Sequence, residues 1–254
     1  MKITIAIPAY NEEKIIGQKI DQLFKFCQEQ LSRPSFSSKN LGGYQWLIVV
    51  AINGSKDKTL EIVQEKSKIY SNLEYVNLDT PGKGGAIRKA WQTYTGDINI
   101  FMDADLSTEL KSIHKLIKAI EQENYQIVIG SRYQKQSHLE RSVIRSLFSH
   151  TYNLILKIFF NLKITDASCG FKAVSKKVIE KIVPKIKNND LFFDTELLIL
   201  ARQSNLSIKE IPVTWRDEKQ RKTKIKIFKT SFAYFKEIIK LKARLLKRRA
   251  KISI

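Results

Sequence analysis

The hydrophobic positions of this chain fall into short apolar runs separated by amphipathic segments. In the first half, the apolar runs lie at 2–7, 45–52, 73–78 and 98–102. They predict β-strands, because strands covered on both faces are almost continuously hydrophobic. Residues 12–29, 59–70 and 86–95 lie between these runs, and we interpret them as helices. This alternation predicts an α/β fold with a mostly parallel sheet flanked by helices.

The second half follows the pattern less regularly. Residues 127–129 predict another strand, and residues 139–162 and 191–203 predict helices. Residues 208–215 also predict a strand, but Pro212 makes a central place in the sheet unlikely because proline donates no backbone hydrogen bond. We find no internal repeat and no low-complexity linker, and we expect one domain at 1–218 followed by a basic tail at 219–254.

Polar or glycine-rich loops follow four of the predicted strands, at 8–12, 53–57, 81–85 and 103–109. A parallel sheet would bring these loops together at one edge, where ligands of open α/β sheets bind. Asp103-Ala104-Asp105 follows the strand at 98–102. Two carboxylates separated by one residue repel each other and are costly to desolvate without a cation or hydrogen-bond donors. Their hard oxygen atoms suit Mg²⁺ or Mn²⁺, which in turn hold phosphates.

The neighbouring loops carry groups that could hold a nucleotide. The Tyr10 ring and Glu12 carboxylate could contact a base and ribose, and the Asn53 amide offers both a donor and an acceptor to a base edge. Gly82-Lys83-Gly84-Gly85 resembles a phosphate loop, although it lacks the Walker spacing. Each of these segments could also be an ordinary turn.

Arg132, Arg141, Arg145 and Ser149 form a second group of interest. The last three recur at four-residue spacing and would share one face of a helix. A solvated basic face is the simpler interpretation, but apolar residues between 147 and 160 border it. Guanidinium groups suit phosphate, so an anionic lipid head with a long tail would match this surface.

The charge of the chain is concentrated at its C-terminal end. The sequence has 45 Lys and Arg against 25 Asp and Glu, and fourteen of the basic residues lie in 219–254 with only Glu237 opposing them. Helical spacing relates the apolar residues of this tail: Phe228, Phe232, Phe235, Ile239 and Leu246. A basic amphipathic helix is typical of membrane-surface binding, although packing on the globular domain is the alternative. We expect an anionic membrane surface as partner and no nucleic acid, because no RNA-binding module is recognisable.

Other features bear on location. The two cysteines, Cys27 and Cys169, are far apart and fit a reducing compartment. Pro8 and Asn11 end the first apolar run too soon for a signal peptide, and no run is long enough to span a bilayer. We expect a cytoplasmic protein that is peripheral on the cytoplasmic face of a membrane.

Together the motifs resemble the family-2 glycosyltransferases of the GT-A fold, and more narrowly the dolichyl-phosphate β-glucosyltransferases and related polyprenyl-phosphate enzymes. Seven segments carry the resemblance, in the order of the family, across about residues 3–216. They are Ile7 to Glu13, Gly82 to Arg88, Phe101 to Asp105, Gly130 to Arg132, Asp166 to Lys172, Phe193 to Leu198, and Ile211 to Trp215.

The resemblance implies inverting transfer of a hexose, with glucose and UDP-glucose favoured, to a polyprenyl or dolichyl phosphate. It implies that Asp103 and Asp105 bind Mg²⁺ or Mn²⁺ and, with Arg132, are the catalytic residues. The implied nucleotide-sugar contacts are Pro8, Tyr10, Glu12, Asn53, Lys83, Asp103 and Lys222, and the implied acceptor-phosphate contacts are Arg132, Arg141, Arg145 and Ser149. Lys222 lies in a basic stretch where the family has a loop that closes over the diphosphate.

The chain departs from the family pattern in two places. Ile52-Asn53 stands where two acidic residues are usual, and the loop near residue 220 lacks the usual Gly-Ser-Lys. Three alternatives therefore stay open. They are a GDP-mannose donor, a sugar-hydroxyl acceptor with Asp194 or Glu196 as base, and, more remotely, a non-catalytic basic protein that binds membrane or nucleic acid.

Overall fold

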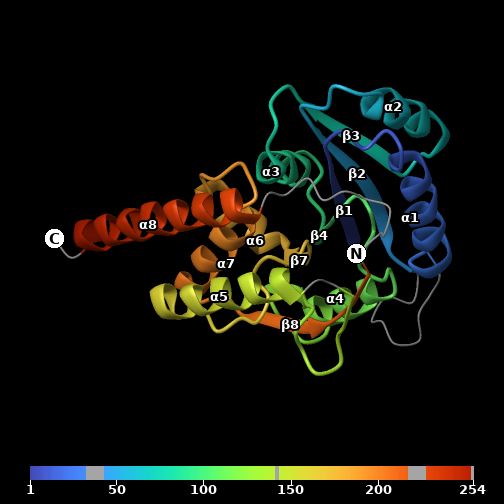
Figure 1. Cartoon of the computed structure of the whole chain (residues 1–254). Coiled ribbons are helices and arrows are strands. Elements are labelled where there is room, and N and C mark those ends of the chain that lie inside the picture. The colour runs from blue at the N-terminus through green and yellow to red at the C-terminus, as the bar shows by residue number, and fades with distance from the viewer. Residues whose placement is uncertain (33–42, 141–142, 217–226, 253–254) are drawn as a thin grey trace.

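The computed structural model describes residues 1–32, 43–140, 143–216 and 227–252; for 139–140, 143–145, 227–231 and 248–252 only the backbone is described. Its centre is a seven-stranded sheet with the order β3-β2-β1-β4-β7-β5-β8 (Figure 1). The strands are β1 (Lys2–Ala9), β2 (Gln45–Asn53), β3 (Leu73–Leu78), β4 (Ile98–Met102), β5 (Ile127–Ser131), β7 (Phe171–Ser175) and β8 (Ile208–Pro212). Only β7 runs antiparallel to its neighbours, so the other six share one direction.

Helices cover both faces of the sheet, which confirms the predicted architecture. One face packs on α1 (Ile16–Gln30), α2 (Thr59–Ile69) and α4 (Ser112–Glu121). The other packs on α3 (Lys83–Thr93), α5 (Val143–Phe160), α6 (Lys176–Lys181), α7 (Phe193–Gln203) and α8 (Ile227–Ile252), with a short 3₁₀ turn at Val183–Lys185. Burial of the strands from both sides explains their continuous hydrophobicity.

In the first half, the predicted strands agree with the structure to within two residues, but one helix begins earlier than predicted. Helix α3 starts at Lys83, so Gly84 and Gly85 lie in its first turn rather than in a loop. Glycine disfavours helices, and here packing overrides that preference. A Cβ built at Gly84 would lie 2.3 Å from the Cβ of Phe193, so only glycine allows α3 and α7 to approach this closely.

The second half corrects two predictions. The helix predicted at 139–162 begins only at Val143, because His138–Glu140 forms strand β6, which pairs in parallel with β9 (Thr214–Arg216). The single strand predicted at 208–215 is divided into β8 and β9. Its proline behaves as expected, since Pro212 ends β8, which lies at the edge of the sheet.

Helix α8 has two faces with different environments. Ile238, Leu241 and Leu245 are buried in the same core cluster as α3 and α7. Phe232 and Ile239 are exposed on the other side. The inner face of α8 belongs to the main core. The division into a domain at 1–218 and a tail at 219–254 stays a prediction. Among the helices in the described part of the chain, none combines the length and apolar character needed to cross a bilayer.

Candidate active site

The loops after β1, β2 and β3 are joined by hydrogen bonds at the carboxyl edge of the sheet. The Asn53 side chain donates to the Ala9 carbonyl (2.9 Å) and accepts from the Gly82 amide (3.4 Å). The Asn11 amide donates to Ser55 Oγ at 3.0 Å. These three loops therefore lie together, as the parallel sheet predicts, and the bond from Lys83 to Asp103 joins the fourth loop to them. The side-chain amide of Asn53 is buried and hydrogen-bonded to backbone groups, so its contact with a base stays a prediction.

Asp103 lies at the centre of this edge, directly after β4. Its Oδ1 accepts a hydrogen bond from Lys83 Nζ at 2.8 Å. Its Oδ2 faces Gly170, where an added Cβ would lie only 2.0 Å away. Burial alone would raise the pKa of Asp103, but the charges of Lys83, Arg132 and Lys172 lower it below the ordinary value. The carboxylate is therefore ionised at neutral pH.

Asp105 completes the carboxylate pair. Its Oδ1 accepts from the Ser107 amide at 3.1 Å, which fixes the turn after β4. Within the described ranges, no three His, Cys, Asp or Glu side chains are grouped closely enough to hold a metal by themselves. Mg²⁺ is commonly held by one or two carboxylates plus substrate phosphates. Asp103 and Asp105 fit that arrangement, since they offer hard oxygen atoms and leave further positions to a diphosphate.

Partly buried Lys83, fully buried Lys172 and Asp194 extend the charged cluster around Asp103. Lys83 Nζ lies 3.9 Å from Asp194 Oδ2, and Lys172 Nζ lies 3.1 Å from Asp194 Oδ1. Both ammonium groups also lie 5.3 Å from the centre of the Phe101 ring. Burial opposes the charge of Lys83, but Asp103 and Asp194 raise its pKa above the ordinary value. A permanent positive charge is thus held at the first turn of α3, which is a favourable place for phosphate.

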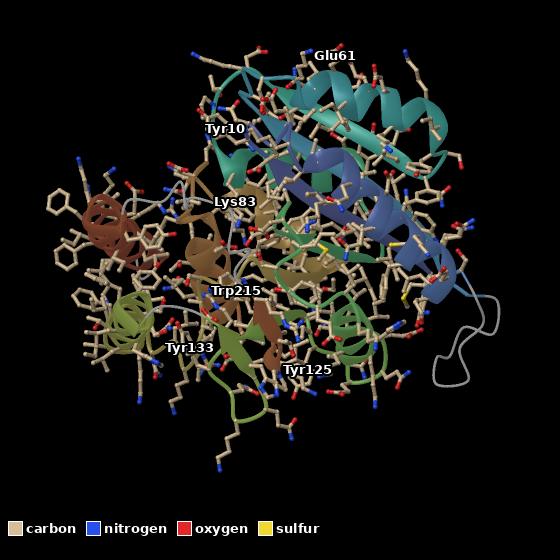
Figure 2. All side chains as sticks on the ribbon, turned by 45° about the vertical axis from the view of Figure 1, so that its right-hand side comes forward. Tyr10, Glu61, Lys83, Tyr125, Tyr133 and Trp215 are labelled. Atoms are coloured by element: carbon tan, nitrogen blue, oxygen red, sulfur yellow. The ribbon has the colours of Figure 1, made fainter. Side chains whose placement is uncertain are left out.

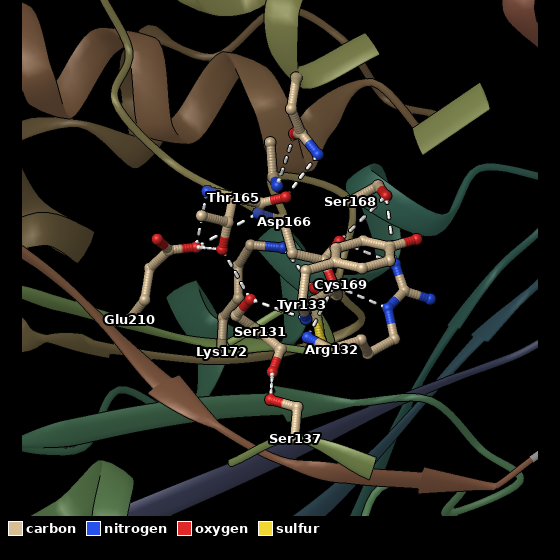
Figure 3. A network of polar contacts seen from close by, with 12 residues as sticks. Ser131, Arg132, Tyr133, Ser137, Thr165, Asp166, Ser168, Cys169, Lys172 and Glu210 are labelled. Atoms are coloured by element: carbon tan, nitrogen blue, oxygen red, sulfur yellow. Dashed lines mark hydrogen bonds and ion pairs between the residues drawn. The ribbon is translucent and has the colours of Figure 1, made fainter. Parts of the chain in front are cut away.

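Arg132 follows β5 at the same edge and is bound to Asp166 (Figure 3). Its Nε and Nη2 donate to the two carboxylate oxygens at 2.7 and 2.8 Å, and its backbone amide adds a third bond at 3.1 Å. The Tyr133 and Trp215 rings lie 5.9 and 5.8 Å from the guanidinium carbon. Burial opposes the charge, yet Asp166 raises the pKa of Arg132 above its ordinary value.

Four other predicted site residues have described positions in the structure. Pro8 lies in β1, and Tyr10 is 37% exposed just beyond that strand (Figure 2). Glu12 is buried, and its backbone amide donates to Thr59 Oγ1 at 2.8 Å. Ser149 is buried on α5, one helical turn after Arg145. The Arg145 side chain, Arg141 and Lys222 lie outside the described part of the chain.

The two carboxylates considered as bases for a hydroxyl acceptor are both bound within the protein. Asp194 lies between Lys83 and Lys172. Glu196 accepts the backbone amides of Lys187 and Asn188 at 3.0 and 2.8 Å and also binds Arg244 of α8. Glu196 therefore fastens a loop and α8 to α7.

Sequence reasoning assigned no role to Asp166, Gly170 or Lys172, although it singled out the segment that contains them. Asp166 and Arg132 are 34 residues apart in the chain, and nothing in their local patterns relates them. Lys172 would have been detectable as a lysine in an otherwise apolar strand, because a fully buried lysine needs a partner.

The chain is similar to proteins that are named as glycosyltransferases. The family model described as "Glycosyl transferase family 2" matches residues 4–183. Dolichyl-phosphate β-glucosyltransferase of Saccharomyces cerevisiae is 30% identical over 85% of this chain and 67% of its own length. Glycosyltransferase AglD of Haloferax volcanii is 26% identical over 85% of this chain, but that match spans only 33% of AglD.

Solved structures agree on the fold. Glucosyl-3-phosphoglycerate synthase from Mycobacterium tuberculosis, in complex with Mn²⁺, UDP and glucosyl-3-phosphoglycerate, superposes with a TM-score of 0.66 at 18% identity, covering 97% of this chain and 79% of that one. With a family model that matches most of the chain and a site at the carboxyl edge of a GT-A-like sheet, this protein belongs to glycosyl transferase family 2.

Proposed function

We propose that this protein transfers glucose from UDP-glucose to a polyprenyl or dolichyl phosphate at a membrane surface, with inversion at the anomeric carbon. The observation that carries the proposal is the position of Lys83, Asp103 and Arg132 at one sheet edge: Lys83 Nζ lies 2.8 Å from Asp103 Oδ1, and Asp103 and Arg132 directly follow β4 and β5, which share one direction. This arrangement provides an anchor for a nucleoside diphosphate beside a cation suited to a second phosphate. Relatives named dolichyl-phosphate β-glucosyltransferase support the choice of sugar and acceptor, and a β-linked product from an α-linked donor requires inversion.

Asp103 and Asp105 would hold the divalent metal, Mg²⁺ or Mn²⁺. The bound ion would neutralise charge on the departing diphosphate. Lys83 is held by Asp103 at 2.8 Å, so it lies where its ammonium can also meet the diphosphate. Tyr10, which is partly exposed beyond β1, offers an aromatic surface to the base.

The acceptor needs orientation rather than activation. A phosphate monoester is largely ionised near neutral pH and can attack without a general base. The role left to Arg132 and to Ser149 of α5 is to fix the phosphate in line, which is catalysis by positioning and electrostatics. A sugar hydroxyl would instead need a base, and both candidates, Asp194 and Glu196, are held by cations. The structure thus favours the phosphate acceptor.

Helices α5 and α8 provide the surface for the lipid. Of the eleven exposed large hydrophobic side chains in the described part of the chain, eight lie on these two helices: Leu147, Leu154, Ile158, Phe159, Phe232, Phe235, Ile239 and Leu246. Lys242 of α8 donates to the carbonyl of Phe159, so the helices are in direct contact, and both lie along one side of the molecule (Figure 1). Basic and apolar groups together suit an anionic bilayer on its cytoplasmic face.

The test compares two acceptors that differ by one group. Purified protein is incubated with Mn²⁺ or Mg²⁺, a panel of labelled UDP- and GDP-sugars, and either a polyprenyl phosphate or the matching polyprenol. We expect label in the lipid fraction with UDP-glucose and polyprenyl phosphate only. Transfer from GDP-mannose would show that the proposed donor is wrong, and transfer to polyprenol would show that the proposed acceptor is wrong. No transfer from any donor would refute the proposed function. This comparison is cleaner than an Asp194→Asn variant, which would also disturb Lys83 and Lys172.

A further inference from the structure

We propose that Asp166 is a positioning residue for the acceptor phosphate, acting through Arg132. The inference rests on the proposed function, since it assigns Arg132 the acceptor phosphate as its ligand. Its basis is the hydrogen-bonding geometry around one guanidinium group and the cost of burying that group.

Asp166 fixes the guanidinium in both position and rotation. Its two oxygens accept from Nε and Nη2, and Oδ2 accepts the Arg132 backbone amide as well. Ser168 Oγ adds a contact to Nη2 at 3.3 Å. A planar fork held on one edge has no rotational freedom. The Nη1 corner, which Asp166 does not engage, is then the part of the group that can meet an anion.

The surroundings place that guanidinium in the candidate site. Arg132 directly follows β5 at the carboxyl edge of the sheet, and the segment that holds it at Asp166 continues to Gly170, which lies against Asp103 Oδ2. The rings of Tyr133 and Trp215, both labelled in Figure 2, lie 5.9 and 5.8 Å from the guanidinium carbon and come from separate segments. A cation held this way requires little reorganisation when charge arrives, which is what preorganised electrostatic stabilisation needs.

Stability explains the pair poorly. Arg132 is 8% exposed and Asp166 is fully buried. Removing two charges from water costs several kcal/mol per ion, and buried ion pairs are often no more stabilising than apolar residues of the same size. The segment has a separate fastening, because Glu210 accepts the amides of Thr165 and Asp166 at 2.9 and 3.2 Å. Orientation of Arg132 is the role that remains for the Asp166 carboxylate.

The test is the separation of acceptor and donor kinetics in Asp166→Asn. We expect the KM for polyprenyl phosphate to rise about tenfold or more, as loss of a hydrogen bond to a charged group implies, while the UDP affinity measured by calorimetry with Mn²⁺ changes less than twofold. In an Arg132→Ala background, the same change should add less than twofold to the acceptor KM. Glu210→Gln, which touches the same loop without contacting Arg132, is the matched control and should leave both constants within twofold.

Equal increases in the donor and acceptor constants, or an unchanged acceptor KM in a folded Asp166→Asn protein, would overturn the inference. If Asp166→Asn fails to fold, Ser168→Ala decides in its place: a rise of two- to threefold in the acceptor KM supports the inference, and no rise overturns it. Failure of the proposed function is a distinct result, since wild-type protein would then bind no UDP-sugar or transfer no sugar to polyprenyl phosphate.

Discussion

Gly170→Ala is expected to inactivate the protein without unfolding it. The added Cβ would lie 2.0 Å from Asp103 Oδ2 and 2.5 Å from its carboxyl carbon, whereas real Cβ contacts essentially never fall below 3.0 Å. The carboxylate or the loop that carries residue 170 must therefore move by at least about 1 Å, the difference between these distances. A misplacement of this size can cost about 100-fold in rate. Overpacking should cost about 1–3 kcal/mol of stability.

The assay is kcat/KM for transfer of glucose to polyprenyl phosphate, with UDP binding measured by calorimetry in the presence of Mn²⁺ and unfolding measured in urea. Gly17→Ala on α1 is the matched control. Its added Cβ would meet only side-chain atoms of Ile62 and Lys66, at 3.3 and 3.9 Å, and neither of these residues is a predicted site residue. Wild-type binding and turnover in a folded Gly170→Ala protein would refute the claim that Asp103, held against Gly170, forms the donor site.

Three further predictions concern Lys83, Arg244 and the exposed phenylalanines of α8. Lys83→Met should raise the pKa of Asp103, because Lys83 is the first of the cations that lower it. Ionised Asp103 stabilises bound UDP–Mn²⁺, and this contribution is lost as pH falls through the pKa. In a titration from about pH 7 to 4, the variant should therefore lose UDP–Mn²⁺ binding at a higher pH than wild type, and superimposable titrations would contradict this. Arg244→Ala removes a charged partner from buried Glu196 and should lower the urea unfolding free energy by about 1.5–3 kcal/mol; an unchanged midpoint and slope would show that α8 is not fastened there. Changing Phe232 and Phe235 to serine should weaken binding to anionic vesicles at least tenfold, since each phenylalanine that becomes buried in the membrane contributes about 1.5–3 kcal/mol. The control is Ile69→Ser on α2, which is 70% exposed as against 74% for Phe232; it should bind as wild type, and equal loss in both variants would argue against the α5–α8 surface.

The sequence predicted the sheet edge well because the relevant signals are local. The runs at 73–78 and 98–102 are the strands β3 and β4 without change. A shared strand direction then brings Asp103 beside Lys83, as the parallel-sheet rule implies. The candidate donor site could thus be assembled from strand ends alone.

What the sequence could not provide depends on contacts between distant segments. Antiparallel β7 enters the sheet between β4 and β5, and its position brings Gly170 against Asp103. The pairing of β6 with β9 converts the start of a predicted helix into a strand. Asn53 looked suited to a base, yet its amide joins Ala9 and Gly82. Local propensity contains no information on such pairings.

The chemical linkage in the product tests the central claim most directly. Wild-type protein is supplied with UDP-glucose, Mn²⁺ and polyprenyl phosphate, and the glucolipid is isolated for phosphorus and proton NMR. The account predicts a β-glucosyl phosphodiester, with the phosphorus coupled to the anomeric proton, and no such product from an Asp103→Asn protein that still folds. An α-linked product, glucose attached to a hydroxyl group, or release of free glucose and UDP alone would contradict it.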